Sequence, residues 1–167
     1  AGDFILNNDA TFGIINGRLS VATSVTGMLS VGGSVEMNGS SKIVRDTARA
    51  QIIFNGTQQQ KIGLQNLSDS ILVQVNNSLG IELTKNLSWV GILALTSGNI
   101  VLSNHVLTVD SIQGGSSSAF VMADSVGALR RYCGNKTVVF PVGTSHSYAP
   151  VTIQNAGIND WFSVGVV

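Results

Sequence analysis

The sequence predicts an all-β protein, with a right-handed parallel β-helix (β-solenoid) over residues 1–118 and a short β-sandwich-like C-terminal unit over residues 119–167. Three observations predict this fold class. Short runs of alternating apolar and polar residues recur along the chain, and two or three such runs make a unit of about 20 residues. No proline occurs before Pro141. Because proline cannot donate a hydrogen bond to a central ladder, its absence fits stacked strands.

The expected strands are short, and each ends in Gly, Asn or Ser, which turn the chain at low energetic cost. In chain order the runs are "LSV" at Leu19 and Leu29, "VEM" at Val35, "ILVQV" at Ile71, "IEL" at Ile81, "LAL" at Leu93 and "LTV" at Leu107. Residues 41–51 permit a helical turn, although a strand and loop are favoured there. Asn-Gly pairs at Asn16, Asn38 and Asn55 leave a hairpin-rich sandwich as the alternative fold.

The stretch Gly114–Ser118 consists of five small residues and is the best linker in the sequence. Most of the aromatic residues and both prolines follow it, which indicates a second unit or a cap on the last coil. In "FPVGTSHSYAP", Pro141 is expected to end one strand, Gly143 to allow a turn and Pro150 to start the next strand. This unit is expected to be truncated or to continue into another domain.

The charge balance argues against nucleic acid as a partner. Charged residues make up 11% of the chain, and nine basic residues balance nine acidic ones. Nucleic-acid binding requires clustered Lys and Arg, whereas Arg130-Arg131 is the only adjacent basic pair here.

The apolar runs are too short for membrane insertion. The two histidines have no second ligand nearby and the acidic residues are scattered, so neither a metal nor a cofactor is expected.

The sequence does not favour an enzyme. Ser145, His146 and Asp110 could be combined into a nucleophilic triad, but no strained Gly-x-Ser-x-Gly turn supports it. Asp110 with Arg130 could serve a polysaccharide-cleaving β-helix, although only their presence argues for that role. His146 is expected at the tip of a turn.

The remaining candidate residues are expected to be structural. His105 is expected at a corner of a coil, and Cys133 as a small buried apolar residue. Trp89 and Trp161 could stack against sugars, but burial within strands is the commoner role of tryptophan.

Residues 50–165 resemble a recurring module in large secreted surface proteins of Bacteroidota. The resemblance is carried by "GILALTSGNIVLSNHVLTVD", "GGSSSAFV", "GALRR" and "TVVFPVGTSHSYAPVTI", in this order and spacing. In that family a β-helical stretch leads into an "FPVG…Y.P" segment, often upstream of a type IX secretion sorting tail, which does not follow here. The resemblance implies export and an extracellular or cell-surface location, and it implies no particular activity.

A second pattern resembles the O-glycan acceptors of exported Bacteroidota proteins, which read Asp, then Ser or Thr, then an aliphatic residue. Four of the nine acidic residues stand in such triplets. The candidate O-glycosylation sites are therefore Thr47, Ser70, Ser111 and Ser125. Glycans at coil corners would supply the hydrophilic bulk that the sparse charges do not.

These observations predict a non-catalytic structural or adhesive module of an extracellular surface protein or filament, able to self-assemble end to end. Its partners would be further copies or further domains of the same protein. The apolar, uncharged C-terminal run is the candidate assembly strand, with Trp161, Phe162, Val164 and Val166 as its residues. The alternative function is a carbohydrate-binding module that contacts surface glycans. A polysaccharide-cleaving β-helix enzyme is a further, less favoured alternative.

Overall fold

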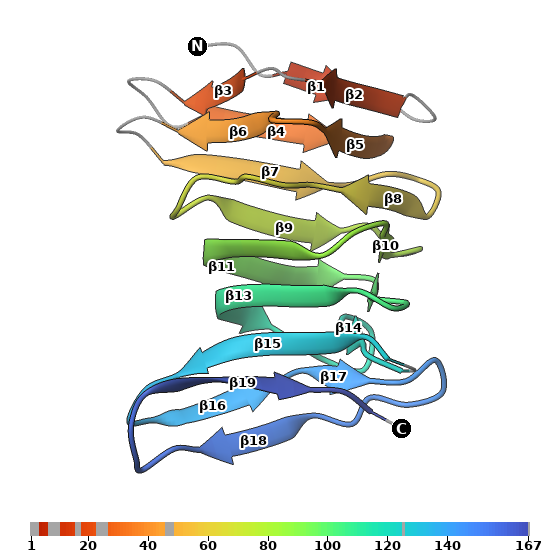
Figure 1. The fold of residues 1–167 in the computed structure, drawn as a ribbon. Helices are drawn as coiled ribbons and strands as arrows, with labels where there is room; N and C mark the ends of the chain where they lie inside the picture. Colours follow the sequence, from red (N-terminus) through yellow and green to blue (C-terminus); the bar gives the residue numbers. More distant parts are fainter. Residues whose placement is uncertain are drawn as a thin grey trace.

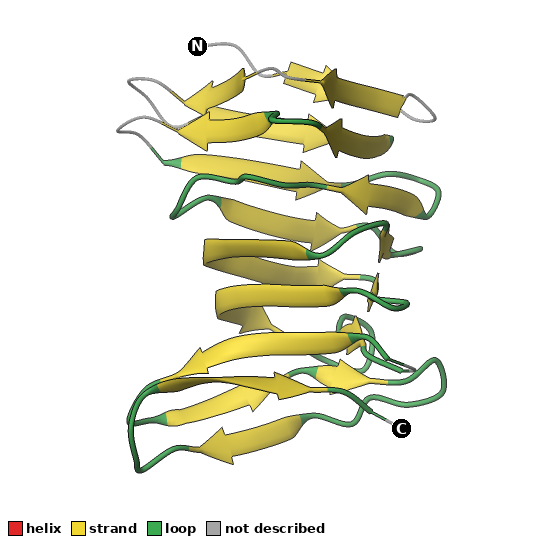
Figure 2. Ribbon diagram, in the orientation of Figure 1, coloured by secondary structure: helices red, strands yellow, loops and turns green. Residues whose placement is uncertain are grey.

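The computed structural model describes residues 4–6, 11–15, 18–22, 27–45, 49–124 and 126–166. These residues form strands, turns and loops and contain no helix, as Figure 2 shows. The strands are β1 (Phe4–Leu6), β2 (Thr11–Ile15), β3 (Arg18–Ala22), β4 (Gly27–Val31), β5 (Ser34–Asn38), β6 (Lys42–Arg45), β7 (Ala50–Phe54), β8 (Gln60–Gly63), β9 (Leu72–Asn76), β10 (Ile81–Leu83), β11 (Leu87–Ser97), β12 (Ile100–Val101), β13 (Val106–Gly114), β14 (Val121–Met122), β15 (Ala128–Cys133), β16 (Thr137–Phe140), β17 (Val142–Gly143), β18 (Val151–Gln154) and β19 (Asp160–Val164).

Two long sheets run along the molecule, as the stacked arrows of Figure 1 show. Sheet 1 has eight strands in the order β1-β4-β7-β9-β11-β13-β15-β19, and sheet 2 has seven in the order β17-β14-β12-β10-β8-β5-β2. Every pairing within these two sheets is parallel except that of β15 with β19. Successive strands of the chain therefore belong to different faces, and each face gains one strand per turn.

A third face completes each coil. β3 pairs with β6, and an isolated parallel bridge joins Ile43 to Leu67. Farther along, the first halves of the long strands β11 and β13 occupy this face, and β15 pairs with the first half of β13. The register between β11 and β13 shifts between Trp89 and Ile92, so both strands bend there from the third face into sheet 1. The chain thus forms a parallel β-solenoid of about five turns, which confirms the predicted fold class.

The coils shorten along the chain. Residues that face each other in sheet 1 are 23 positions apart at Leu29 and Ile52, and 21 apart at Ile52 and Val73. The spacing is 20 between Val73 and Leu93, and 19 between Leu93 and Ile112. The unit of about 20 residues seen in the sequence is therefore one coil, which agrees with the expected period.

The core is a stack of apolar layers inside the coils. Because side chains alternate between the two faces of a strand, every second residue points inward, and the same positions meet in successive coils. The inward side chains of sheet 1 include Leu29, Val31, Ile52, Phe54, Val73, Val75, Leu93 and Leu95, all at most 5% exposed. Those of the third face include Ile43, Leu67, Leu87, Leu107 and Leu129. Burial of each such side chain contributes about 1.5–3 kcal/mol relative to exposure.

One buried position of sheet 2 carries an amide. Gln60 lies in register with Ile81, in the inward column that continues through Ile100. Its Nε2 donates to the carbonyl oxygens of Val31 and Gly33, and its Oε1 accepts from the backbone N–H of Gly56 and from Asn77 Nδ2. The amide thus satisfies corner groups in three neighbouring segments, which offsets the cost of burying it.

One part of the chain agrees with the sequence-based picture and another part differs from it. Residues 42–45 form strand β6, in agreement with the favoured strand and loop, whereas residues 46–48 lie outside the described residues. Gly114–Ser118 is not a linker between units. Parallel pairing continues past the expected boundary at residue 118, because β14 pairs with β12 and β17 pairs with β14. The five small residues instead form a corner, where Ser116 and Ala119 exchange backbone hydrogen bonds of 2.9 and 3.1 Å.

The C-terminal unit changes the direction of pairing. β16 and β18 form a two-stranded antiparallel sheet, and β19 runs antiparallel to β15 (Figure 1). Pro141 ends β16 and Pro150 precedes β18, as the sequence indicated. The turn between them is closed by a hydrogen bond of 2.9 Å from Thr144 N–H to the Ser147 carbonyl. We call residues 134–166 the cap.

Candidate functional site

The candidate assembly strand is the last strand of sheet 1. β19 pairs antiparallel with β15, in a register that places Trp161 opposite Tyr132 and Val164 opposite Leu129. Beyond β19, the backbone N–H of Val166 donates to the carbonyl of Ala123 at 2.9 Å. The run therefore closes over the last parallel coil and does not form a further parallel rung. Within the described strands β15 is the only ladder partner of β19, so its other edge bounds the sheet.

The four residues of this strand have two environments. Phe162, Val164 and Val166 are half-buried and pack against the core. Trp161 is also half-buried, and its ring contacts that of Tyr132 edge-on, with 5.5 Å between centroids. The guanidinium carbon of Arg130 lies 5.6 Å from the centroid of the Trp161 ring. The strand thus uses its apolar residues to cover the coil and presents one aromatic group beside a cation.

At strand β16 no β-ladder joins the cap to the solenoid within the described structure. The second half of β13, in sheet 1, leads into β14 of sheet 2, and β16 leads into β17 of sheet 2 in the same way. β16 therefore occupies the position in the last coil that the second half of β13 occupies in the coil before it. However, the only ladder partner of β16 in the described structure is β18. The missing ladder is replaced by one side chain, because Arg131 Nη1 donates to the carbonyl of Val139 and Nη2 lies 3.5 Å from the carbonyl oxygen of Asp110. Arg131 therefore connects β16 to β13.

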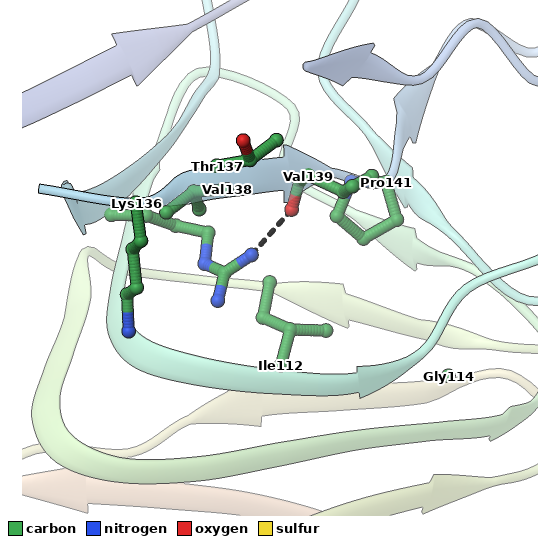
Figure 3. Close-up of a pocket in the computed structure, with 8 residues that line it drawn as sticks. Ile112, Gly114, Lys136, Thr137, Val138, Val139 and Pro141 are labelled. Atoms are coloured by element: carbon green, nitrogen blue, oxygen red, sulfur yellow. Dashed lines mark hydrogen bonds between the residues drawn. The ribbon is translucent and has the colours of Figure 1, made fainter. Parts of the chain in front are cut away.

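A cavity of about 270 Å³ lies in this gap. Its lining consists of Ile112, Gly114, Arg131, Lys136, Thr137, Val138, Val139 and Pro141. Figure 3 shows Lys136 and Ile112 on different sides of the space, with Val139 in β16 and Pro141 directly after that strand. The lining combines two cationic side chains with aliphatic groups and contains no carboxylate.

Arg131 is a buried cation, with 8% of its surface exposed. Burial lowers the pKa of its guanidinium, and nearby Cys133 and Asp110 partly offset this effect. An arginine stays protonated even so, and its charge must be accommodated inside the protein. The aromatic ring of Phe140 lies 5.8 Å from the guanidinium carbon and contributes a weak attraction. Arg131 Nε is fully buried and has no hydrogen-bond partner.

Two of the four candidate O-glycosylation sites lie in the described part of the chain. Ser70 is exposed in a turn, with a φ of 62°, and its N–H donates to the carbonyl of Val90 at 2.6 Å. Ser111 is half-buried in β13, directly after the register shift. Both residues lie at the corner where the third face meets sheet 1. Thr47 and Ser125 lie outside the described residues.

The residues of the hypothetical active sites are not joined to one another. His146 is exposed at the tip of the turn, as expected, and the N–H of Ser145 is bonded to Asp124 Oδ2. In the part of the chain that the structure describes, no hydrogen bond or ion pair connects Ser145, His146 and Asp110. Arg130 contacts Trp161 and not Asp110. These side chains therefore form no catalytic arrangement with one another in this structure.

The other candidate residues are placed as follows. Trp89 is 4% exposed and donates to the carbonyl of Ile71 at 3.1 Å, so its ring is not available to a sugar. Cys133 is buried, as expected, and burial raises the pKa of its thiol. His105 follows a turn after Leu102, which agrees with a corner position. Across the described ranges there is no group of three or more His, Cys, Asp or Glu residues that could hold a metal ion.

Sequence reasoning missed Arg131 as a functional candidate. As an adjacent basic pair, Arg130-Arg131 suggests only a patch for nucleic acid, and two charges are too few for that. The signal lay in the alternation of "ALRRYC", because strand geometry sends adjacent side chains to opposite faces. If Leu129 and Cys133 point inward, Arg131 must point inward too, and the structure has this pattern.

Among the described residues there is no long apolar helix that could cross a membrane. No family model, curated protein or solved structure matches the chain. The resemblance to the Bacteroidota surface module thus stays a prediction from the sequence.

Proposed function

We propose that this chain is a non-catalytic structural or adhesive module of an extracellular surface protein or filament. The observation that supports the proposal is the end of sheet 1, where β19 has β15 as its only ladder partner within the described strands. β19 is five residues long, and its only charged residue is Asp160 at its beginning. The N–H and C=O groups on its outer edge can pair with a strand of another chain or domain.

The geometry of the solenoid favours propagation along its axis. β1 and β19 are the two end strands of the same sheet, at opposite ends of the stack (Figure 1). A contact from one end of a molecule to the other end of the next extends into a filament when its rotation does not close a ring. The same edges serve equally well for continuation into further domains of one long protein.

The test is to block the edge of β19 without disturbing the core. Ser163 is exposed in the middle of β19, and a lysine there places a charge on the edge, as natural edge strands do. We expect Ser163→Lys to abolish concentration-dependent assembly in light scattering. Ser145→Lys adds the same charge to the exposed turn and should leave assembly intact. An unmodified chain that stays monomeric at high concentration would refute non-covalent assembly.

Export and O-glycosylation are part of the same proposal and rest on the sequence resemblance. The exposure of Ser70 supports it as an acceptor, and the half-buried Ser111 is the weaker of the two described sites. Intact mass spectrometry of the protein from its natural source should show added mass that is lost in Ser70→Ala. A bare chain of 17.4 kDa would contradict this part of the proposal.

The second candidate function is carbohydrate binding, and Trp161 is the observation that favours it. This ring is half-buried, and Tyr132 and Arg130 flank it, whereas Trp89 is buried. Aromatic rings beside polar groups are common features of sugar-binding surfaces. Specific binding on a glycan array that is lost in Trp161→Ala and kept in the edge variant Ser163→Lys would favour this function over assembly.

A further inference from the structure

The guanidinium of Arg131 has unused hydrogen-bonding capacity. An arginine carries five N–H donors. The hydrogen bonds of Arg131 in the structure are those to the carbonyl oxygens of Val139 and Asp110, and the second is long at 3.5 Å. Its Nε–H has no partner although the atom is buried. Buried donors without partners are rare in native proteins, and charged ones are especially costly.

The charge of Arg131 is not neutralised by an ion pair within the described part of the chain. Lys85 forms an ion pair with Glu36, far along the solenoid from the cap. Asp110 offers its backbone carbonyl to Arg131, while its side chain is exposed. Lys136 brings a second positive charge to the same cavity. The cavity therefore brings two positive charges together without a carboxylate in its lining, and Asp110 offsets the charge of Arg131 only in part.

The cavity has the size and lining of a small ligand site. A volume of about 270 Å³ lies just below the roughly 300–1,000 Å³ typical of ligand pockets, so it suits a single small group. In the described structure the pairing of β13 with β15 ends at Thr108. Ile112 and Gly114, which line the cavity, therefore have no ladder partner on the side toward the cap. Thr137 adds a hydroxyl group to the lining. Two cations with neutral polar groups and no carboxylate constitute a setting for an anion.

We propose that this cavity binds a single oxoanion group, a carboxylate or a sulfate, between Arg131 and Lys136. Guanidinium groups bind these planar or tetrahedral anions through paired, charge-assisted hydrogen bonds. A bound anion would compensate the buried charge and join the cap to the last coil through β13 and β16. The proposal does not depend on assembly through β19, because the cavity and that strand's outer edge are different surfaces.

The experiment is a titration followed by amide and arginine Nε–H nuclear magnetic resonance. The probes are sodium sulfate, sodium acetate and sodium glucuronate, compared with sodium chloride at equal ionic strength. We expect saturable shifts of the Arg131 Nε–H signal and of the Thr137–Val139 amides with at least one oxoanion and none with chloride. Tighter binding of glucuronate than of acetate would identify an acidic sugar as the source of the bound carboxylate group. The reverse order would identify a free small carboxylate ion as the ligand.

The matched variants are Lys136→Gln and Lys61→Gln, since both lysines are exposed and neither substitution removes core volume. We expect Lys136→Gln to weaken binding about fivefold, in line with a partly exposed charge pair, and Lys61→Gln to leave it unchanged. Arg131 itself is not the test residue, because its loss would also release β16. Absence of saturable shifts, or equal weakening by both lysine variants, would overturn the proposal.

Discussion

The parallel stack and the cap bury apolar groups in different ways. In the stack, the same inward positions recur in coil after coil, and neighbouring strands satisfy each other's backbone groups. In the cap, β16 and β18 pair only with each other, and β19 pairs with β15 alone in the described structure. Long side chains then make the connections that ladders make elsewhere, above all Arg131 between β13 and β16.

This difference indicates how a solenoid can end. A parallel coil needs another coil above it, so its last strand edge is exposed unless the chain changes direction. Here the chain reverses at the turn of Thr144–Ser147 that follows β17. The two strands after this turn run antiparallel to the last coil, with β18 beside β16 and β19 beside β15. The cost is an incomplete fit, visible as the cavity beside Arg131. The stack should therefore be the more stable region, and the cap should open by local unfolding at a lower free energy.

The largest expected effect is on the stack. Phe54 is fully buried in sheet 1, in register with Val31 and Val75. Phe54→Ala leaves a cavity between coils and should lower the free energy of unfolding by about 3–5 kcal/mol. Denaturant unfolding followed by circular dichroism measures this, with the exposed Val126→Ala as control. A loss no larger than that of the control would contradict the layered core.

The next effect concerns the buried amide of sheet 2. Gln60→Leu keeps a similar volume but leaves the carbonyl of Gly33 and the N–H of Gly56 without the partner that Gln60 supplies, whereas the Val31 carbonyl keeps its bond from Asn55 N–H. The expected loss is about 2–4 kcal/mol, because each unsatisfied buried group costs about 1–3 kcal/mol. The neighbouring Gln59 is exposed, so Gln59→Leu should have little effect. If the two variants had equal stabilities, the corner network would not be important to the stack.

On the cap side, two adjacent arginines provide a matched pair. Arg131→Ala should cost about 2 kcal/mol, since it removes hydrogen bonds from a buried charged group. Arg130→Ala loses a cation–π contact at the surface and should cost about 0.5–1 kcal/mol. Hydrogen exchange should show faster opening of β16 and β18 in Arg131→Ala, with β7 and β9 unchanged. Equal acceleration in both regions would show that cap and stack unfold as one unit.

The smallest expected effect is a pH dependence from Cys133. Burial raises the pKa of its thiol in the folded protein, so the folded state holds the proton more tightly than the unfolded state. The resulting stability is fully present below the pKa of the unfolded thiol, about 8.5, and is lost as the pH rises through the folded pKa. Denaturation midpoints of the unmodified protein should therefore fall more steeply above this pH than those of Cys133→Ala. Parallel curves for the two proteins would contradict the prediction.

Much of the solenoid could be predicted from the sequence, because its fold follows from local rules. Alternation in runs such as "ILVQV" determines which side chains of β9 point inward, and the repeat of about 20 residues predicts their stacking. The prolines of "FPVGTSHSYAP" likewise marked the end of β16 and the start of β18. These features depend on backbone geometry and on residues close in sequence, so the sequence alone determined them.

The cap and its cavity were decided only by the tertiary structure. Nothing local in "WFSV" distinguishes another parallel rung from a strand that turns back against β15, because both need the same apolar pattern. Gly114–Ser118 has the composition of a linker, yet the continuation of sheet 2 makes it a corner. Arg131 became the link between β13 and β16 only because those strands fail to pair. Pairing between segments far apart in sequence depends on which edges remain open after the stack has formed, and no local pattern records that.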